Sequence, residues 1–431
     1  MQTIDQLLKG ELKGVKRLQL SCGLEHFPRE IFELCDTLEI LDLSGNNLHE
    51  LPEDFGRLKH LKIVFFSNNN FTVFPAALAN CPNLSMIGFK SNRISEFPED
   101  ALPIGTQWLI LTDNKIEKLP ESLGDCVFLQ KVAFAGNQIA HLPESMANCK
   151  RLELLRISAN KLESIPEWLL KLPKLSWLAF SGNPCSHKIE NAKINQISWG
   201  ELEVQQQLGE GASGIISKAI WKSTDQKEVA IKIFKGEVTS DGYPEDELAT
   251  CISTGSHSNL VPLLGEIKNH SENKKGIVME LISSDYSNLG NPPSFETCTR
   301  DVYEENTVFT MNKLLAISSS VAAAAKHLHD KGIVHGDLYA HNTMVNSFGN
   351  ALLGDFGAAT CYSKDFPNAD LLERLDVRAF GCLLEELISR SDDTLHASFE
   401  ILNQIKNDCF QEEVIKRPSF SEILSALNLL K

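Results

Sequence analysis

The sequence predicts a multidomain protein in which an α/β solenoid of short repeated strands is followed by a two-lobed α+β domain. Two observations lead to this prediction. An asparagine recurs every 22 or 23 residues through the first half of the 431-residue chain. In the second half, a glycine-rich segment, a strand with one lysine and two acidic motifs follow one another. Because the periodicity stops around Pro184–Gly200, we place the repeat domain at 1–190, a linker at 191–201 and the second domain at 202–431, with the change near Asn191.

Seven asparagines define the repeats: Asn46, Asn69, Asn92, Asn114, Asn137, Asn160 and Asn183. Each is preceded by apolar residues at positions −5 and −3, and in six copies an apolar residue and a proline follow. This pattern resembles the leucine-rich repeat LxxLxLxxNxL over about residues 14–185, with a degenerate N-terminal copy at Leu18–Pro28. The resemblance implies seven to eight repeats, each a short strand and a return segment, in which the asparagines satisfy backbone groups.

Strand alternation predicts which repeat residues face outward. If positions −5 and −3 point into the core, position −6 points out, and six of its seven residues are large and apolar. We define these six as the apolar stripe: Ile40, Ile63, Met86, Trp108, Leu154 and Trp177. A solvated sheet face rarely carries so much apolar surface. We therefore expect the stripe to dock a protein, either a partner or the chain's own C-terminal domain, and keep an ordinary apolar surface as the alternative.

Composition excludes some classes of partner. The net charge of −16 argues against nucleic acid and against an anionic membrane surface. The chain shows no signal peptide at its start, and its most apolar stretch, Leu314–Ala325, is too short to span a bilayer. The eleven cysteines lack zinc-site spacing, and four of them recur at one repeat position, so we interpret them as small buried side chains. These features together predict a cytoplasmic protein.

A glycine-rich loop opens the second domain. Gly209, Gly211 and Gly214 form GxGxxG, a spacing that dinucleotide-binding domains also use. However, Ile215–Trp221 is rich in β-formers and Asp225-Gln226 is typical of a hairpin turn, whereas a dinucleotide site requires a helix there. The pattern therefore favours a glycine loop between two strands.

The strand Val229–Lys232 contains one lysine, which is costly to bury unless opposite charge meets it. We expect that charge from phosphates and from a helix carboxylate. Pro244 and Gly255 are typical of the start and end of a helix, which makes Glu247 the first choice and Glu245 the second.

The octet His335–Asn342 places Asp337 five residues before Asn342, and Asp355 follows in Leu353–Gly357. Phosphoryl transfer uses such a set: one carboxylate to accept a hydroxyl proton, and an amide oxygen and a second carboxylate to hold metal ions.

These motifs, in this order, resemble a protein kinase domain, and with the repeats the chain resembles an intracellular leucine-rich repeat protein kinase. The resemblance implies transfer of the ATP γ-phosphate to a protein hydroxyl, most simply of serine or threonine, with Mg²⁺. It implies catalytic roles for Asp337, Lys232 and Asn342, and metal ligation by Asn342 and Asp355. The implied ATP site comprises Leu208, Gly209, Gly211, Gly214, Ile216, Ala230, Lys232, Glu247, Met279 as gatekeeper, Glu280 and Ile282. Asp376 and Arg417 would be structural.

Four departures from the kinase pattern leave the function open. Gly336 stands where kinases usually have the arginine that pairs with a phosphorylated activation loop, and no Ala-Pro-Glu follows. Tyr339-Ala340 stand where serine/threonine kinases have Lys-Pro. The polar stretch Ser283–Asn306 has the character of an insertion near the substrate cleft. Besides a protein kinase, we therefore keep two alternatives, a pseudokinase scaffold and a small-molecule kinase. The second is kept because His-Gly-Asp-Leu also occurs in aminoglycoside and choline phosphotransferases.

Overall fold

The computed structural model describes residues 2–187, 194–211, 213–235 and 238–430. It divides into two compact units: Met1–Leu172 with Asn183–Cys185, and Pro173–Gly182 with Ser186–Lys431. This division differs from the predicted boundaries, because the segment Pro173–Gly182 belongs to the second unit. The predicted point of change, Asn191, lies outside the described residues.

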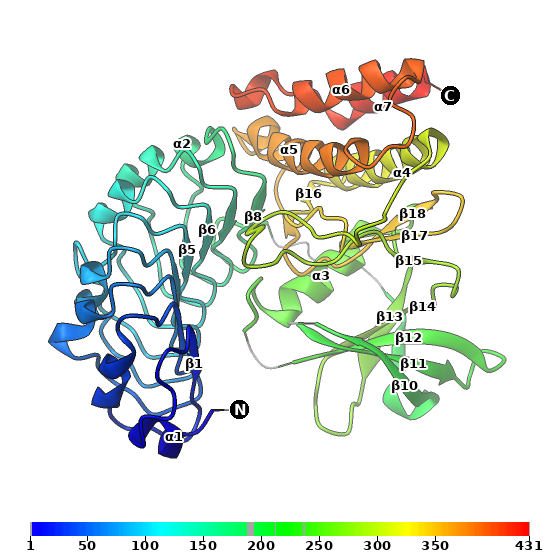
Figure 1. Ribbon diagram of the computed structural model, residues 1–431. Helices are drawn as coiled ribbons and strands as arrows, with labels where there is room; N and C mark the ends of the chain where they lie inside the picture. Colours follow the sequence, from blue (N-terminus) through cyan, green and yellow to red (C-terminus); the bar gives the residue numbers. More distant parts are fainter. Residues whose placement is uncertain (1, 188–193, 212, 236–237, 431) are drawn as a thin grey trace. The chain divides into compact units, whose positions relative to one another are not determined.

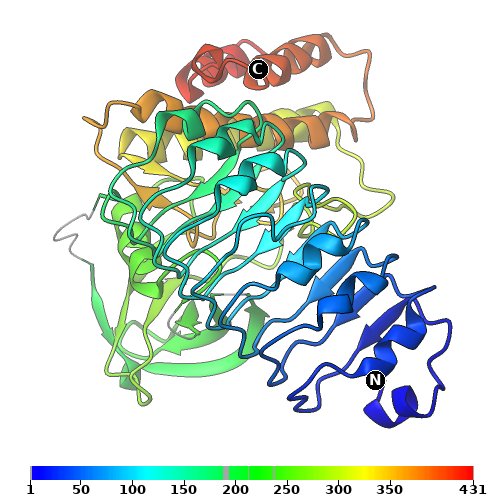
Figure 2. The same cartoon turned by 90° about the vertical axis from the view of Figure 1, so that its left-hand side faces the viewer.

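The first unit is a leucine-rich repeat solenoid with one short strand per repeat, as Figures 1 and 2 show in blue to cyan. Helix α1 (Ile4–Leu8) precedes a parallel sheet in chain order: β1 (Arg17–Gln19), β2 (Ile40–Asp42), β3 (Ile63–Phe65), β4 (Met86–Gly88), β5 (Trp108–Ile110), β6 (Lys131–Ala133) and β7 (Leu154–Arg156). Most return segments contain one short helix: η1 (Arg29–Leu34), η2 (Glu53–Arg57), η3 (Ala76–Asn80), η4 (Glu121–Asp125), η5 (Glu144–Asn148) and α2 (Glu167–Leu170). The return segment between β4 and β5, residues 89–107, contains none.

The repeat asparagines form a ladder that joins neighbouring copies. Asn69 Oδ1 accepts a hydrogen bond from Leu48 N at 2.9 Å, and its Nδ2 donates to Leu43 O at 2.9 Å and to Phe66 O at 3.1 Å. The pattern repeats through Asn183, which bonds Leu162 N and Ile157 O. The asparagines therefore satisfy backbone groups at each turn out of a strand, as the sequence predicts.

The second unit has a mixed sheet and a group of helices (Figure 1). The sheet order is β10 (Leu202–Glu210), β11 (Gly214–Trp221), β12 (Lys227–Phe234), β14 (Gly276–Glu280), β13 (Leu263–Lys268) and β9 (Gln196–Ser198). The predicted hairpin turn is present, since Asp225 and Gln226 both have positive φ between β11 and β12. Strand β9 lies in the segment predicted as a linker and pairs in parallel with β13. Helix α3 (Pro244–Thr254) begins and ends at the predicted residues.

The helical part contains α4 (Met311–Asp330), α5 (Ala369–Ile388), α6 (Ala397–Cys409), η7 (Val414–Lys416) and α7 (Phe420–Asn428). Short strands frame the loops between them: β15 (Ser287–Asn288), β16 (Ile333–Val334), β17 (Thr343–Val345), β18 (Ala351–Leu353) and β19 (Thr360–Cys361). Strand β8 (Trp177–Ala179) and the turn η6 (Trp199–Glu201) complete the second unit. One core cluster joins the two lobes, with Phe234 and Ile277 from the sheet packing near Leu328 and Phe356. Within the described part of the chain, no helix has both the length and the apolarity needed to cross a bilayer.

Candidate active site

A buried ion pair joins the sheet to helix α3. Lys232 Nζ on β12 bonds Glu247 Oε1, and both side chains are less than a tenth exposed. Burial by itself would lower the pKa of Lys232, but the carboxylates of Asp355 and Glu247 raise it above its usual value. The lysine is therefore held charged, with the first-choice glutamate as its partner. The second choice, Glu245, pairs with Lys275 at the surface instead.

The predicted nucleotide-binding residues gather on neighbouring strands. The register of β11, β12 and β14 places Ile216 opposite Lys232 and Ala230 opposite Met279. Gly209 and Gly211 lie at the hairpin between β10 and β11, with Leu208 exposed just before them. At Gly214 a Cβ would lie 2.7 Å from Ile233 O, so only glycine fits this close approach of two strands.

Two predicted residues differ from this group. Glu280 ends β14, and its side chain pairs with Lys227 at 2.5 Å, so the main chain is the part left to meet a ligand. Ile282 follows the strand in an irregular connection and is partly buried.

The octet forms a loop between β16 and β17 that is tied together internally. Asn342 Nδ2 donates to Asp337 Oδ2 at 2.8 Å and to Asp337 O at 2.9 Å. Helix α5 fixes the start of the loop, because Asp376 accepts from His335 N at 2.7 Å and from Gly336 N at 3.0 Å. Burial by itself would raise the pKa of Asp376, but the hydrogen bond and charge of His329 hold it below its usual value. The loop is therefore anchored on an ionised carboxylate.

Asp355 lies beside this loop and beside the lysine. Its Oδ1 is 3.8 Å from Lys232 Nζ and accepts from Gly357 N at 3.2 Å, and half of its side chain is exposed. Gly354 N donates to Asn342 O at 2.9 Å, which brings the two segments together. The Oδ1 of Asn342 accepts no hydrogen bond from another described residue. Asp355 and Asn342 thus offer the oxygen donors that Mg²⁺ prefers.

No group of three His, Cys, Asp or Glu side chains in the described ranges could hold a metal by itself. Proteins commonly bind Mg²⁺ through one or two side chains, while substrate phosphates and water supply the other ligands.

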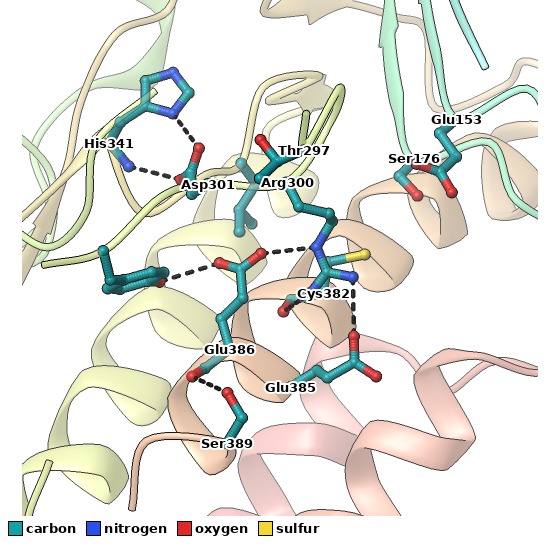
Figure 3. Close-up of polar contacts among 12 residues, drawn as sticks. Glu153, Ser176, Thr297, Arg300, Asp301, His341, Cys382, Glu385, Glu386 and Ser389 are labelled. Atoms are coloured by element: carbon teal, nitrogen blue, oxygen red, sulfur yellow. Dashed lines mark hydrogen bonds and ion pairs between the residues drawn. The ribbon is translucent and has the colours of Figure 1, made fainter. Parts of the chain in front are cut away.

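The far side of the loop is held by residues that the sequence analysis did not single out. In the inserted stretch, Asp301 accepts from His341 N at 2.9 Å and lies 2.7 Å from His341 Nδ1 (Figure 3). Burial by itself would lower the pKa of His341, but Asp301 raises it above its usual value. Arg300 next to it donates to Glu386 at 2.7 Å and to Glu385 at 2.9 Å on α5 (Figure 3). The insertion is therefore fastened both to the loop and to α5.

Comparison with known families agrees with this geometry. Residues 202–370 match the family of protein tyrosine and serine/threonine kinases, and residues 36–94 match the leucine-rich repeat family. The second unit is a protein kinase domain. Its lysine, glutamate, paired loop and second aspartate stand in the kinase order described above.

Several similar proteins are named as serine/threonine-protein kinases. A probable serine/threonine-protein kinase of Dictyostelium discoideum is 28% identical over 47% of this chain and 13% of the relative. A probable LIM domain-containing serine/threonine-protein kinase of the same organism is 28% identical over 57% of this chain and 41% of the relative. The serine/threonine-protein kinase PSK2 of Saccharomyces cerevisiae is 26% identical over 52% and 23%, respectively. The chain thus spans less than half the length of each of these relatives.

The kinase domain has a very short segment after its second acidic motif. Strand β19 ends at Cys361, and α5 begins at Ala369. A tyrosine in this connection is hydrogen-bonded to α5, since Tyr362 OH donates to Glu373. The connection between these two elements is therefore only residues 362–368.

Proposed function

We propose that this chain is an ATP-dependent protein kinase that transfers the γ-phosphate of ATP to a serine or threonine hydroxyl of a protein. The observation that carries the proposal is the placement of Lys232 between Glu247 and Asp355. A buried lysine held charged beside a half-exposed carboxylate is suited to meet nucleotide phosphates. The acceptor class is supported by the relatives named as serine/threonine kinases.

Each residue has a separate role in this proposal. Asp337 accepts the proton of the attacking hydroxyl, and Asn342 orients it through the 2.8 Å hydrogen bond to Oδ2. Lys232 binds phosphate oxygens, and Glu247 keeps the lysine in place. Asp355 and the Oδ1 of Asn342 would hold Mg²⁺, which neutralises phosphate charge when bound.

The test is phosphate transfer by the full chain, with labelled ATP, Mg²⁺ and a mixture of protein acceptors. Lys232→Ala and Asp337→Asn should each remove transfer, whereas Glu245→Gln, which changes an exposed pair, should keep it. If the wild-type chain binds ATP but labels no acceptor, the kinase proposal is wrong and a pseudokinase scaffold accounts better for the site.

One observation favours a second candidate, a small-molecule kinase. Only residues 362–368 connect β19 to α5, which leaves little chain to hold a peptide. The same assay with aminoglycosides and choline as acceptors separates the two candidates. Labelling of a small hydroxyl compound in preference to every protein would favour the second.

For the repeats, we propose that the apolar stripe docks a protein, either a partner or the chain's own kinase domain. Its member on β8, Trp177, is 1% exposed. The support is its composition. Ile40, Ile63, Met86 and Trp108 lie in register on neighbouring strands, and a solvated strand face rarely carries such a row. Trp108→Glu should weaken binding of such a partner, and Trp168→Glu on the return side of the repeat should not. Equal binding by both variants would exclude the stripe.

We also propose a cytoplasmic location. Cys126 and Cys149 are buried thiols in neighbouring repeats, and Cys149 Sγ lies 3.7 Å from Cys126 O without a disulfide between them. Neighbouring thiols that stay reduced are typical of a reducing compartment. Fractionation of cells that express the chain would test the proposal.

A further inference from the structure

A segment that the sequence assigns to the last repeat is packed into the kinase domain. Pro173–Gly182, with strand β8, belongs to the second unit, although the residues before and after it in sequence belong to the first. Its contacts reach the catalytic loop, the middle of α5, the segment after Asp355 and the loop before α7. We call it the brace segment.

The central contact is made by Trp177. Its indole Nε1 donates a hydrogen bond to Leu338 O at 3.1 Å, and its ring lies parallel to the ring of Tyr339, with centroids 4.4 Å apart and planes 6° apart. Trp177 is 1% exposed and Tyr339 4%. Leu338 directly follows Asp337, so the tryptophan holds the backbone next to the proposed catalytic base.

The brace segment also meets Gly336 on the other side of Asp337. Gly336 has φ +67°, and a Cβ on it would lie 2.5 Å from Leu178 O and 2.9 Å from Ala358 O. No side chain fits there. Phe180 N donates to Thr360 Oγ1 at 3.3 Å, which ties the brace segment to the strand after Asp355.

Two arginines fix its N-terminal end. Arg417, which is 1% exposed, donates from Nη2 to Pro173 O at 2.8 Å. Its other bonds go to Gln411 O and Arg374 O, so the brace segment supplies one of three carbonyls to this buried guanidinium. Arg378 of α5 donates to Ser176 Oγ at 2.7 Å. These contacts are costly to break, because a buried cation would lose a hydrogen bond.

We propose that the brace segment is a working part of the kinase domain and that Trp177 is a positioning residue for catalysis. The catalytic loop departs from the kinase pattern at Gly336 and Tyr339, and both of these residues contact the brace segment. Only residues 362–368 connect β19 to α5, so the chain has no long activation segment there. The brace segment therefore supplies in cis the support that phosphorylation of an activation loop supplies in other kinases. The inference rests on the proposed kinase function.

The test compares full-length Trp177→Ala and Trp177→Phe with wild type. We expect Trp177→Ala to lower kcat by roughly 10- to 100-fold, since a small displacement of the base is enough for such a loss. The KM for ATP should stay within about twofold, because the contacts of Trp177 go to Leu338 and Tyr339 and not to Lys232 or the described glycines 209, 211 and 214. Trp177→Phe keeps an aromatic ring over Tyr339 but loses the N–H donor, so its kcat should be intermediate.

A second readout does not depend on activity. Hydrogen–deuterium exchange in peptides that cover 336–343 should be faster in Trp177→Ala than in wild type. Trp168→Ala, which removes an indole from α2 of the first unit, is the matched control and should change neither exchange nor kcat. ATP-analogue binding stoichiometry gives the folded fraction, against which kcat is normalised.

The outcomes separate the two proposals. If Trp177→Ala changes neither the exchange of 336–343 nor kcat, the proposal that Trp177 positions the catalytic loop is wrong. A higher kcat would also contradict it and would show that the brace segment obstructs the acceptor site instead. If the wild-type chain transfers no phosphate, the proposed function fails on its own. The exchange of 336–343 still decides whether Trp177 holds the loop.

Discussion

Replacement of Gly336 by alanine tests the packing around the catalytic base most directly. The residue has φ +67°, which lies in the left-handed region of backbone conformation that residues with a Cβ rarely adopt. The added Cβ would lie 2.5 Å from Leu178 O and 2.9 Å from Ala358 O. Both neighbours are backbone atoms, so neither can turn away as a flexible side chain could.

The cost follows from two effects. The left-handed backbone conformation and the forced contact with two carbonyls together destabilise the kinase domain by about 2–5 kcal/mol. For a domain of this size, that lowers the unfolding midpoint by roughly 5–15 °C. Gly336→Arg, which restores the residue usual in kinases, should cost at least as much, because its side chain starts from the same Cβ.

The assay is scanning calorimetry of the full chain. Binding of a non-hydrolysable ATP analogue raises the midpoint of the kinase domain's transition and so identifies it. Gly200→Ala is the matched control, since nothing lies within 4 Å of the Cβ it would add. If Gly336→Ala unfolds at the same midpoint as Gly200→Ala, the close approach of Leu178 to Gly336 does not exist in solution.

Three further predictions concern other parts of the chain. Glu247→Gln removes the buried negative charge that pairs with Lys232. It should lower the free energy of unfolding of the kinase domain by about 3 kcal/mol, measured as a lower midpoint in calorimetry. Asn114→Ala removes hydrogen bonds to Phe89 O, Leu111 O and Ile94 N, and should reduce the free energy of unfolding of the first unit in urea by about 2–4 kcal/mol. The raised pKa of His341 means that its ion pair with Asp301 stabilises the fold fully below the unfolded pKa of about 6.5, and progressively less as pH rises through the folded pKa. The midpoint difference between wild type and His341→Gln should therefore shrink with rising pH in calorimetry from pH 5 to 9.

Each of these predictions has a matched variant. Glu245→Gln changes an exposed ion pair. It should alter the free energy of unfolding by only a few tenths of a kcal/mol, so the unfolding midpoint should hardly move. Asn83→Ala removes an exposed hydrogen bond in the repeats and should cost much less than Asn114→Ala. Asp301→Asn should reproduce the pH dependence of His341→Gln, because either change removes the same pair. Different pH profiles would mean that Asp337 or Asp355, which also raise the pKa of His341, dominate its titration.

Local patterns allowed much of the fold to be predicted from the sequence. The repeat asparagines occur at fixed spacing because each bonds backbone groups in its own turn and in the preceding copy. Helix α3 could be placed because proline fits the first turn of a helix and glycine terminates one. The pairing of Lys232 with Glu247 followed from the cost of burying a lone lysine in a strand.

Non-local contacts could not be predicted in the same way. Trp177 and Leu338 are 161 residues apart, and nothing in the repeat pattern distinguishes Trp177 from the other outward-facing residues of its column. Asp301 lies in a polar insertion without a motif, and only its burial against His341 shows its importance. The identity of Gly336 was noted from the sequence as a departure, but its physical reason, the Leu178 carbonyl, lies in another part of the chain.

The chain order of the brace segment limits how this protein can be rearranged. Residues Leu172 and Asn183, which flank it, belong to the repeat unit, whereas the ten residues between them belong to the kinase unit. A chimaera joined at the linker would therefore replace the brace segment, including Trp177, with the corresponding residues of another protein. The kinase domain would lose these contacts even if every kinase motif were kept. Exchange of repeats between related proteins should succeed only when the crossover lies before Pro173. We expect loss or gain of one repeat to be tolerated upstream of that point, and the segment Pro173–Gly182 to be needed together with the kinase domain.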